Sequence, residues 1–550
     1  MRKFFRISKL SLFFGRLNSI IPSYLNLASL DKYSIIYKRH LRYSRLELPS
    51  FPKSSSGILV DSDIPAANQV ALIHFLPVLS SKYEANCTAY VMRRQEFLTK
   101  HKEYFKFRNS IFSVFGIENF TCAIYSRETF EQSTYFKEVV SGLFNGIESL
   151  NQLQNLVVAN VLIGDLVYDY VLNQNKLWTI DLKDESFKSS FYEFMFFFNY
   201  WREYFSENLV SALCVGHSVY HYGIPARIAA SENIDVFQVN LESIYRITKD
   251  FPFTFTRSSD LRSDFKVLDL AEKSDGMKIA EQRLEARFEG EYSEDVPWST
   301  GSVFGRNTST GFFDNFKKEK LKILIATHHF YDAPHFHGIG LYEDYLIWIQ
   351  RLLVLSKECD YEWFIKVHPN ASFEEYQKIG LLISDFHNVH LLPSDITHHE
   401  ILDNGVEVAL TMFGTIGLEY AYLGKTVINA CPNHLSSSYD FTLTPKTVLE
   451  YEKLILNLKT NIISPSKNEI LEFYYMSYIW HLKSWLVKAY GLYLESVGGY
   501  ENSMSKKALK VLKMSSNLHE ASLINRTLSS FLSSKDLRLN PRNATSINFK

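Results

Sequence analysis

Short apolar runs alternate with amphipathic stretches along most of the chain, a pattern typical of α/β proteins with parallel sheets. In the first half, QVALIHFL, around 70–77, and CTAYVMR (87–93) are predicted strands. Residues 209–240 predict a strand, a turn at Gly216-His217-Ser218, a helix and a second strand. The aromatic run at 191–201 is about half as long as a bilayer span and predicts a buried helix.

The same rhythm returns in the second half, after residues 257–320 lose it in charge clusters and a Gly/Ser/Thr/Asn stretch. A domain boundary is therefore expected near 300–318. Beyond it, helices are predicted at 343–358, 373–384 and after Gly414, and strands at 321–327, 361–367, 388–392, 406–412 and 425–430. The prediction is a doubly wound domain, in which ligands bind beyond the carboxyl ends of the strands.

Net positive charge is concentrated at the two ends of the 550-residue chain. Residues 1–50 carry ten Lys/Arg against Asp31 and Glu47, and the last fifty residues carry nine Lys/Arg against three acidic residues. The net charge of the whole chain is −1. The basic, Phe- and Leu-rich opening is predicted either to lie on an anionic membrane surface or to be a solvated terminus. The expected organisation is a basic segment (1–60), an N-terminal domain (61–310), a C-terminal domain (311–500) and a flexible polar tail (501–550).

Composition narrows the function classes. The balanced charge argues against a polycation that binds nucleic acid, and 46% hydrophobic with 22% charged residues excludes long disorder. The five cysteines form no CxxC pair, so they predict neither a zinc ribbon nor a disulfide framework, and they favour a reducing, cytoplasmic compartment.

The most informative segment is TMFGTIGLEYAYLGKTVI, 411–428. Gly414 allows a ligand to approach the backbone, and Thr415 can cap the following helix, whose first N–H groups suit phosphate oxygens. Glu419, one turn later, is placed to accept hydrogen bonds from ribose hydroxyls. The alternative is an ordinary strand–helix turn with a surface glutamate.

A second candidate is FIKVHPN, 364–370, where Pro369 ends a strand and leaves Lys366 and His368 near its end. A histidine there can donate to phosphate or transfer a proton. The third is the loop after the strand at 321–327, which holds His328, His329, Asp332, His335 and His337. Its spacing matches no helical metal motif, so substrate or phosphate contact is favoured over a metal site or an uninvolved polar loop.

The first half offers candidates for proton transfer. Asp165 and Asp169 in IGDLVYDYVLN are four residues apart and share a face if the segment is helical. His217 follows a predicted strand. Either Asp165 or His217 is suited to deprotonate an acceptor hydroxyl, although Asp165 is equally suited to be a helix N-cap.

Five segments, taken in their order along the chain, resemble bacterial capsule and surface-polysaccharide biosynthesis proteins with the GT-B glycosyltransferase fold. They are VLIGDLVYDYVL, GHSVYHYGIPARIA, the HHFYDAPH loop with its DYLIW helix, IKVHPN and FGTIGLEYAYLGKTVI. The resemblance covers roughly 155–250 and 320–435. It implies two Rossmann-like, doubly wound domains facing across a cleft, with the donor held mainly by the C-terminal one.

The resemblance also implies a function. A sugar would pass from a nucleotide-sugar donor, CMP-activated in related enzymes with an HP motif, to a growing polysaccharide or glycolipid at the inner face of the membrane. His328, Asp332, Lys366, His368, Gly414 and Thr415 would serve the donor, with Glu419 on the ribose. No cofactor or catalytic metal is expected. Met412 and Phe413 are bulky where the family has a small residue, a departure that bears on the pocket.

Three other readings stay open. A CDP-glycerol-type phosphotransferase also resembles GT-B and carries an HP turn. A GT-B scaffold without catalysis would bind nucleotide but turn over no donor. A nucleotide-sugar 2-epimerase shares the fold and needs no acceptor.

Overall fold

The computed structural model describes residues 48–52, 56–64, 66–94, 111–125, 134–240, 243–254, 258–290, 304, 311–316, 319–481 and 518–539. The basic opening, where a membrane contact is predicted, lies outside these residues. None of the described helices is long and apolar enough to cross a membrane.

The N-terminal half is built on a six-stranded sheet in the order β3-β2-β1-β6-β7-β8. Its strands are β1 (Gly57–Asp61), β2 (Asn86–Arg94), β3 (Asn119–Tyr125), β6 (Val210–Val215), β7 (Asp235–Val239) and β8 (Ile244–Ile247). All neighbours pair in parallel except β7 and β8. Chain order reverses between β1 and β6, which makes that point the switch of this sheet.

Helices cover both faces of this sheet. They are α3 (Ala66–Tyr83), α5 (Ile111–Phe115), α7 (Thr134–Asn145), α8 (Leu150–Gln154), α9 (Gly164–Asn175), α10 (Glu185–Glu207), the 3₁₀ turn η3 (Tyr220–Gly223) and α11 (Ile224–Ser231). The short hairpin β4 (Val157–Val158) and β5 (Val161–Leu162) precedes α9.

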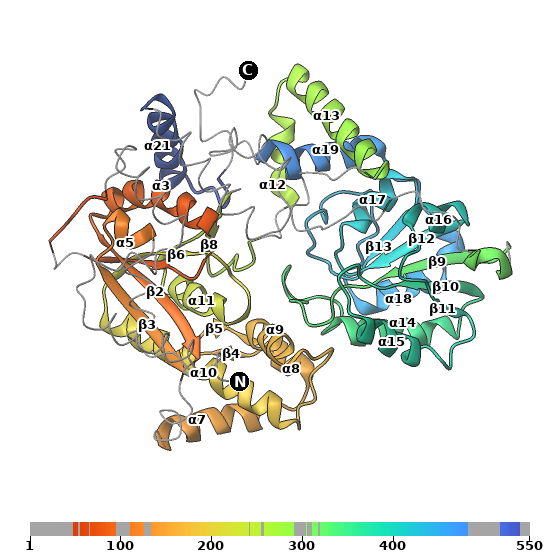
Figure 1. The fold of residues 1–550 in the computed structure, drawn as a ribbon, viewed down its shortest axis with the longest axis horizontal. Helices are drawn as coiled ribbons and strands as arrows, with labels where there is room; N and C mark the ends of the chain where they lie inside the picture. The colour runs from red at the N-terminus through yellow and green to blue at the C-terminus, as the bar shows by residue number, and fades with distance from the viewer. Residues whose placement is uncertain are drawn as a thin grey trace, which may run out of the picture.

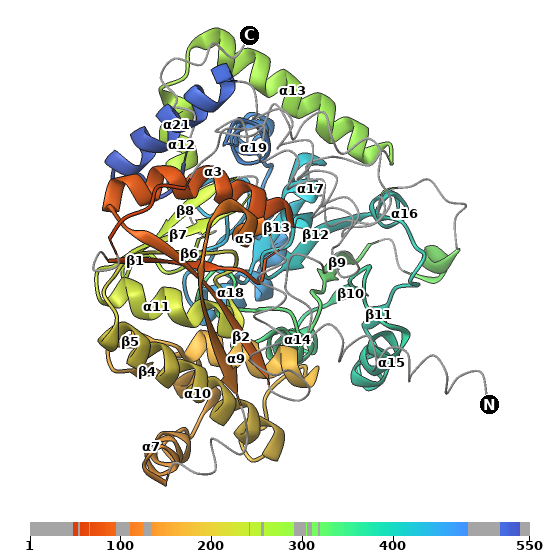
Figure 2. The same cartoon turned by 60° about the vertical axis from the view of Figure 1, so that its left-hand side comes forward.

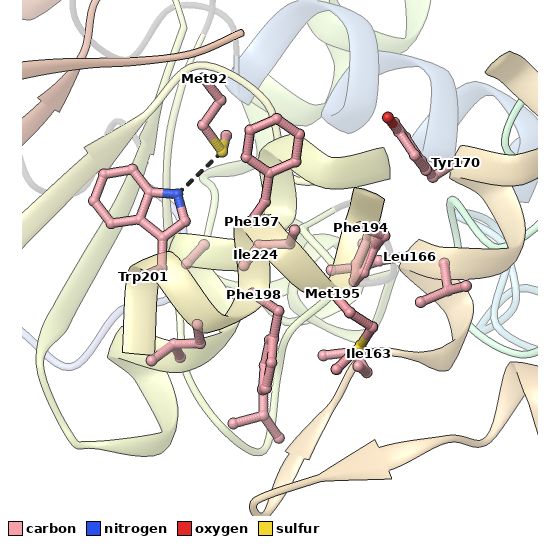
Figure 3. Packing of buried hydrophobic residues seen from close by; sticks show 14 of the residues in the cluster. Met92, Ile163, Leu166, Tyr170, Phe194, Met195, Phe197, Phe198, Trp201 and Ile224 are labelled. Atoms are coloured by element: carbon pink, nitrogen blue, oxygen red, sulfur yellow. Dashed lines mark hydrogen bonds between the residues drawn. The ribbon is translucent and has the colours of Figure 1, made fainter. Parts of the chain in front are cut away.

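The predicted buried helix is α10, and its aromatic stripe packs against α9, α11 and the sheet (Figure 3). Trp201 is fully buried and its indole N–H points at the sulfur of Met92 on β2, 3.1 Å away.

One predicted strand is wrong: QVALIHFL lies inside helix α3. This run is buried on nearly all sides, between β1, β2 and the helix α21 (Leu518–Ser533). A uniformly apolar run has neither the helical nor the strand period, so the pattern alone cannot separate the two.

The C-terminal half has a five-stranded, fully parallel sheet in the order β11-β10-β9-β12-β13. The strands are β9 (Leu321–Ala326), β10 (Tyr361–Lys366), β11 (Val389–Leu391), β12 (Val406–Thr411) and β13 (Thr426–Asn429). They agree with the predicted strands. The switch of this sheet lies between β9 and β12.

The helices of this half are α14 (Tyr345–Ser356), α15 (Phe373–Leu382), α16 (His398–Asp403), α17 (Ile416–Tyr422), α18 (Val448–Leu456) and α19 (Lys467–Tyr474), with η4 (Phe312–Asn315), η5 (Leu458–Thr460) and the π-helical turn η6 (Tyr475–Trp480). The two sheets confirm the predicted fold class, a GT-B-like pair of Rossmann-like α/β domains (Figure 1).

The chain divides between the two halves differently from the prediction. Helices α12 (Ser258–Lys266) and α13 (Leu270–Phe288) pack with α19 and η6, in the apolar cluster of the C-terminal half. The expected flexible tail contains α21, which lies beside α3 (Figures 1 and 2). Ile524, Leu528 and Phe531 on α21 are buried against the N-terminal core. They repeat at a helical spacing, and the polar residues between them obscure it in the sequence.

Candidate functional site

The loops that follow β9, β10 and β12 meet at the switch point of the C-terminal sheet. His328 follows β9, and its Nε2 lies 3.2 Å from the hydroxyl of Thr411 and 3.4 Å from the backbone N of Phe413. Its ring stacks on Tyr345 with centroids 4.7 Å apart. Burial lowers the pKa of His328 to about 3, so the ring is neutral and holds the turn after β12 in place.

The turn itself is compact. The N–H of Gly414 donates to the Thr411 hydroxyl at 3.1 Å, and a Cβ on Gly414 would lie 3.0 Å from that oxygen. Thr415 occupies the N-cap position of α17, but its side chain makes no capping bond. The backbone N–H groups of Thr415 and Ile416 have no acceptor among the described residues.

His368, after β10, is a neutral donor. Its Nδ1 accepts the N–H of Asn370 at 3.2 Å, so the ring proton lies on Nε2. Nε2 has no partner in the described part of the chain. Burial, aided by neighbouring His329, lowers the pKa of His368. The backbone N–H of His368 donates to Thr327 at 3.0 Å, which links the ends of β9 and β10.

Two predicted donor residues make protein contacts of their own. Lys366 Nζ donates to the carbonyls of Pro393 (3.2 Å) and Ser394 (2.8 Å), and burial lowers its pKa to about 8. Lys366 thus holds the loop that follows β11. Glu419 is buried, and its Oε1 accepts from Nε (2.9 Å) and Nη2 (2.5 Å) of Arg287 on α13. Burial opposes the charge of Arg287, yet the Glu419 carboxylate raises its pKa.

Asp332 joins the two halves of the molecule. Its Oδ1 accepts the hydroxyl of Tyr220 (2.7 Å), from the N-terminal half, and the N–H of Ala333 (2.9 Å). Its side chain is exposed, and no described residue bonds to Oδ2. The negative charge of Asp332 acts on His217, His328 and His368 alike, which shows that all three lie near it.

His217 follows β6, on the N-terminal side of this junction. The ring is exposed, although surrounding protein lowers its pKa and Asp332 partly offsets that effect. Its Nδ1 accepts the N–H of Val219 at 3.3 Å, so the neutral ring presents Nε2–H. Tyr220 and Tyr222 flank it, with ring centroids 6.1 and 6.2 Å away.

Asp165 lies apart from this junction. It is buried in the first turn of α9, where Ile163 occupies the N-cap position, and its Oδ2 pairs with Arg227 at 2.5 Å. Asp169, on the same helix face as predicted, accepts from His335 Nδ1 at 2.6 Å. Burial raises the pKa of Asp169 to about 6, and the Asp169 carboxylate outweighs burial to raise the pKa of His335. This pair, with Gln154 on the other ring nitrogen at 3.0 Å, locks the two halves together.

The structure therefore brings together His217, His328, Asp332, His368, Gly414 and Thr415, and leaves Asp165, Lys366 and Glu419 in bonds with other protein groups. Sequence reasoning missed Tyr220 and Arg287, because each acts through a partner more than 100 positions away. Among the described residues, no group of three or more His, Cys, Asp or Glu side chains is placed to hold a metal ion.

No family model and no curated protein matches the chain. Structures similar in part are UDP-GlcNAc 2-epimerases. That of Neisseria meningitidis, bound to UDP-GlcNAc, is 12% identical over 76% of this chain and 97% of its own, with a TM-score of 0.23. That of Methanocaldococcus jannaschii is 10% identical over 76% and 97%, with a TM-score of 0.24. The fold class of this chain rests on its own strand order.

Proposed function

We propose that this protein is a glycosyltransferase that moves a sugar from a nucleotide-sugar donor to a polysaccharide or glycolipid acceptor. One observation carries the proposal: three N–H donors have no acceptor in the described chain, namely Nε2–H of His368 and the backbone groups of Thr415 and Ile416. They follow β10 and β12, the two strands that flank β9 at the switch point. Such donors in an α/β sheet suit phosphate oxygens.

The neutral state of the two histidines fits this role. Because their pKa values are lowered, His328 and His368 stay uncharged at neutral pH. His328 can then accept the N–H of Phe413, and His368 keeps a single ring N–H donor. As the bond between the anomeric carbon and the phosphate oxygen breaks, negative charge grows on the leaving phosphate. Fixed N–H dipoles stabilise that charge without rearrangement.

The proton from the acceptor hydroxyl goes to Asp332 in this proposal. Its Oδ1 is held by Tyr220 and Ala333, which leaves Oδ2 to take the proton while the acceptor oxygen bonds to the anomeric carbon. A carboxylate beside phosphate would repel it, so this role suits Asp332 better than the predicted donor contact. His217 presents Nε2–H from the other side and would position the acceptor.

Calorimetric binding of CMP, CDP, UDP and GDP tests the donor site, with His368→Ala beside the control His387→Ala, an exposed histidine after α15. We expect one of the four nucleotides to bind the unaltered protein. Its affinity should be at least tenfold lower for the His368 variant and unchanged for the control variant. Preference for CDP with transfer of glycerol phosphate would favour the phosphotransferase, and a change at C2 of the donor sugar without an acceptor would favour an epimerase. Absence of binding by all four would refute the donor site.

A further inference from the structure

The N-terminal sheet has a switch point of its own, between β1 and β6, which the proposed donor site does not use. Asp61 ends β1, and Gly216 follows β6 directly. A Cβ on Gly216 would lie 2.1 Å from the side chain of Ile64, so a glycine is needed for Ile64 to pack there, and it would lie 3.8 Å from Asp61 Oδ2, which places the carboxylate beside this turn. Ligands bind at such points in open α/β sheets.

Polar groups at this point are buried with few bonds. Asp61 is 3% exposed; its Oδ1 accepts the N–H of Asp63 at 2.9 Å, but the only described partner of Oδ2 is the Gly216 N–H at a long 3.4 Å. Tyr90 pairs in register with Asp61 on β2, is 1% exposed, and its hydroxyl has no hydrogen-bond partner in the described chain. Buried polar atoms with open bonding capacity are what a hydroxyl-bearing ligand would satisfy.

The electrostatics of the two groups agree with their closeness. Burial raises the pKa of Asp61 to about 7, and the charge of Asp63 adds to this effect; the N–H groups of Asp63 and Gly216 and the charge of Arg93 oppose it. Burial, together with the charge of Asp61, raises the pKa of Tyr90. Near neutral pH, Asp61 therefore exists in both forms and can donate or accept a hydrogen bond.

Two ion pairs lie near Asp61 and Tyr90, at the end of β2. Arg93 at the end of β2 pairs with Asp63 through two N–H groups, and both side chains are about one-quarter exposed. Arg94 is paired with Glu193. The two arginines are thus matched by carboxylates, and Asp61 adds a further acidic group. An anionic sugar would meet this unmatched acid, whereas a neutral sugar meets donors and acceptors only.

The site lies near the junction described above. The charges of Asp63, Arg93 and Asp61 act on the pKa of Tyr222, which burial raises, and the Tyr222 ring lies beside His217. His217 follows Gly216 and responds to Asp332. A ligand held at Asp61 would therefore extend toward the proposed donor site.

We propose that Asp61, Tyr90, Asp63 and Arg93 form a binding site for the hydroxyl groups of an uncharged sugar, which is the acceptor end. The assignment of this sugar as acceptor rests on the proposed function; the binding site itself does not.

The probe is saturation-transfer NMR with the methyl glycosides of glucose, galactose, mannose and N-acetylglucosamine, against methyl glucuronoside. The full-length protein is compared with Asp61→Asn and with the control Asp235→Asn. Asp235 is the first residue of β7, at the opposite end of the parallel strands from Asp61, and it pairs with Arg246. We expect transfer to at least one neutral glycoside, at least tenfold weaker binding in the Asp61 variant, no loss in the control, and weaker binding of the glucuronoside.

Equal binding by the Asp61 variant, tighter binding of the glucuronoside, or no signal from any neutral glycoside would overturn the site. If Asp61→Asn does not fold, Tyr90→Phe takes its place, since it removes only a hydroxyl; it should weaken binding at least threefold, and unchanged binding would count against the site. Calorimetry separates the two proposals. Nucleotide binding should survive Asp61→Asn, and glycoside binding without any nucleotide binding would leave this site standing while the proposed donor site fails.

Discussion

Replacing Asp165 with Asn tests whether this residue belongs to the chemistry or to the frame. Both partners of the Asp165–Arg227 pair are nearly inaccessible, with side chains 2% and 5% exposed. Removing one charge of a buried pair leaves the other uncompensated, which costs roughly 3–5 kcal/mol. Arg227 retains a 3.3 Å bond to the Leu162 carbonyl and the face of Phe253, 4.8 Å away, so we expect the lower end, about 3 kcal/mol.

The assay is urea unfolding of the full chain, followed by tryptophan fluorescence and circular dichroism. Arg227→Met and the double variant complete the cycle. The double variant should be less destabilised than the sum of the singles, because no charge is then left buried alone. Nucleotide binding should be unchanged.

Loss of less than about 0.5 kcal/mol in Asp165→Asn, the level of an ordinary surface substitution, would refute the structural role. An intact fold together with abolished transfer would restore Asp165 as a catalytic candidate.

Further predictions concern packing and pH. In Gly164→Ala, the new Cβ would lie 2.1 Å from the Leu153 carbonyl oxygen, so we expect a loss of about 1–3 kcal/mol by urea unfolding, and wild-type stability would contradict this overlap. Trp201→Ala should cost about 3–5 kcal/mol because it empties a fully buried volume beside Tyr90, and its Tm should fall in differential scanning calorimetry. Burial lowers the pKa of His398 to about 3, below the value of 6.5 in the unfolded chain, so the unfolded chain binds the proton first. The stability of the folded protein therefore falls as the pH drops below 6.5, by about 1.4 kcal/mol per pH unit for this residue. His398→Gln should flatten that dependence between pH 6.5 and 4.5, and an unchanged slope would contradict the assignment.

Much of the C-terminal half follows from its sequence, because each strand is a short apolar run that ends at a turn signal. Gly414, the His368-Pro369 turn and the loop that begins at His328 all follow such strands, and parallel strands bring their carboxyl ends to one edge. The convergence of these residues was therefore predictable from local pattern alone.

The tertiary structure decided which polar groups are available there. Glu419 and Lys366 have the right chemistry for a donor site, yet Arg287 and the loop at 393–394 occupy their charged atoms. Asp165 and Asp332 are alike in sequence terms, but one is buried against Arg227 and the other is exposed beside Tyr220. These partners are far away along the chain, and the spacing of apolar residues around each side chain carries no information about them.

The sequence by itself determined the α/β class, the positions of most strands and the turns at their ends, because local apolar periodicity and turn chemistry encode these features. Only the tertiary structure decided that QVALIHFL is a helix, that α21 returns to the N-terminal half, and that Asp61 lies almost buried near Tyr90, whose hydroxyl has no partner among the described residues. Each of these three features depends on what surrounds a segment in space. A segment buried on all sides, or a contact with a distant residue, produces no helical or strand periodicity in the sequence.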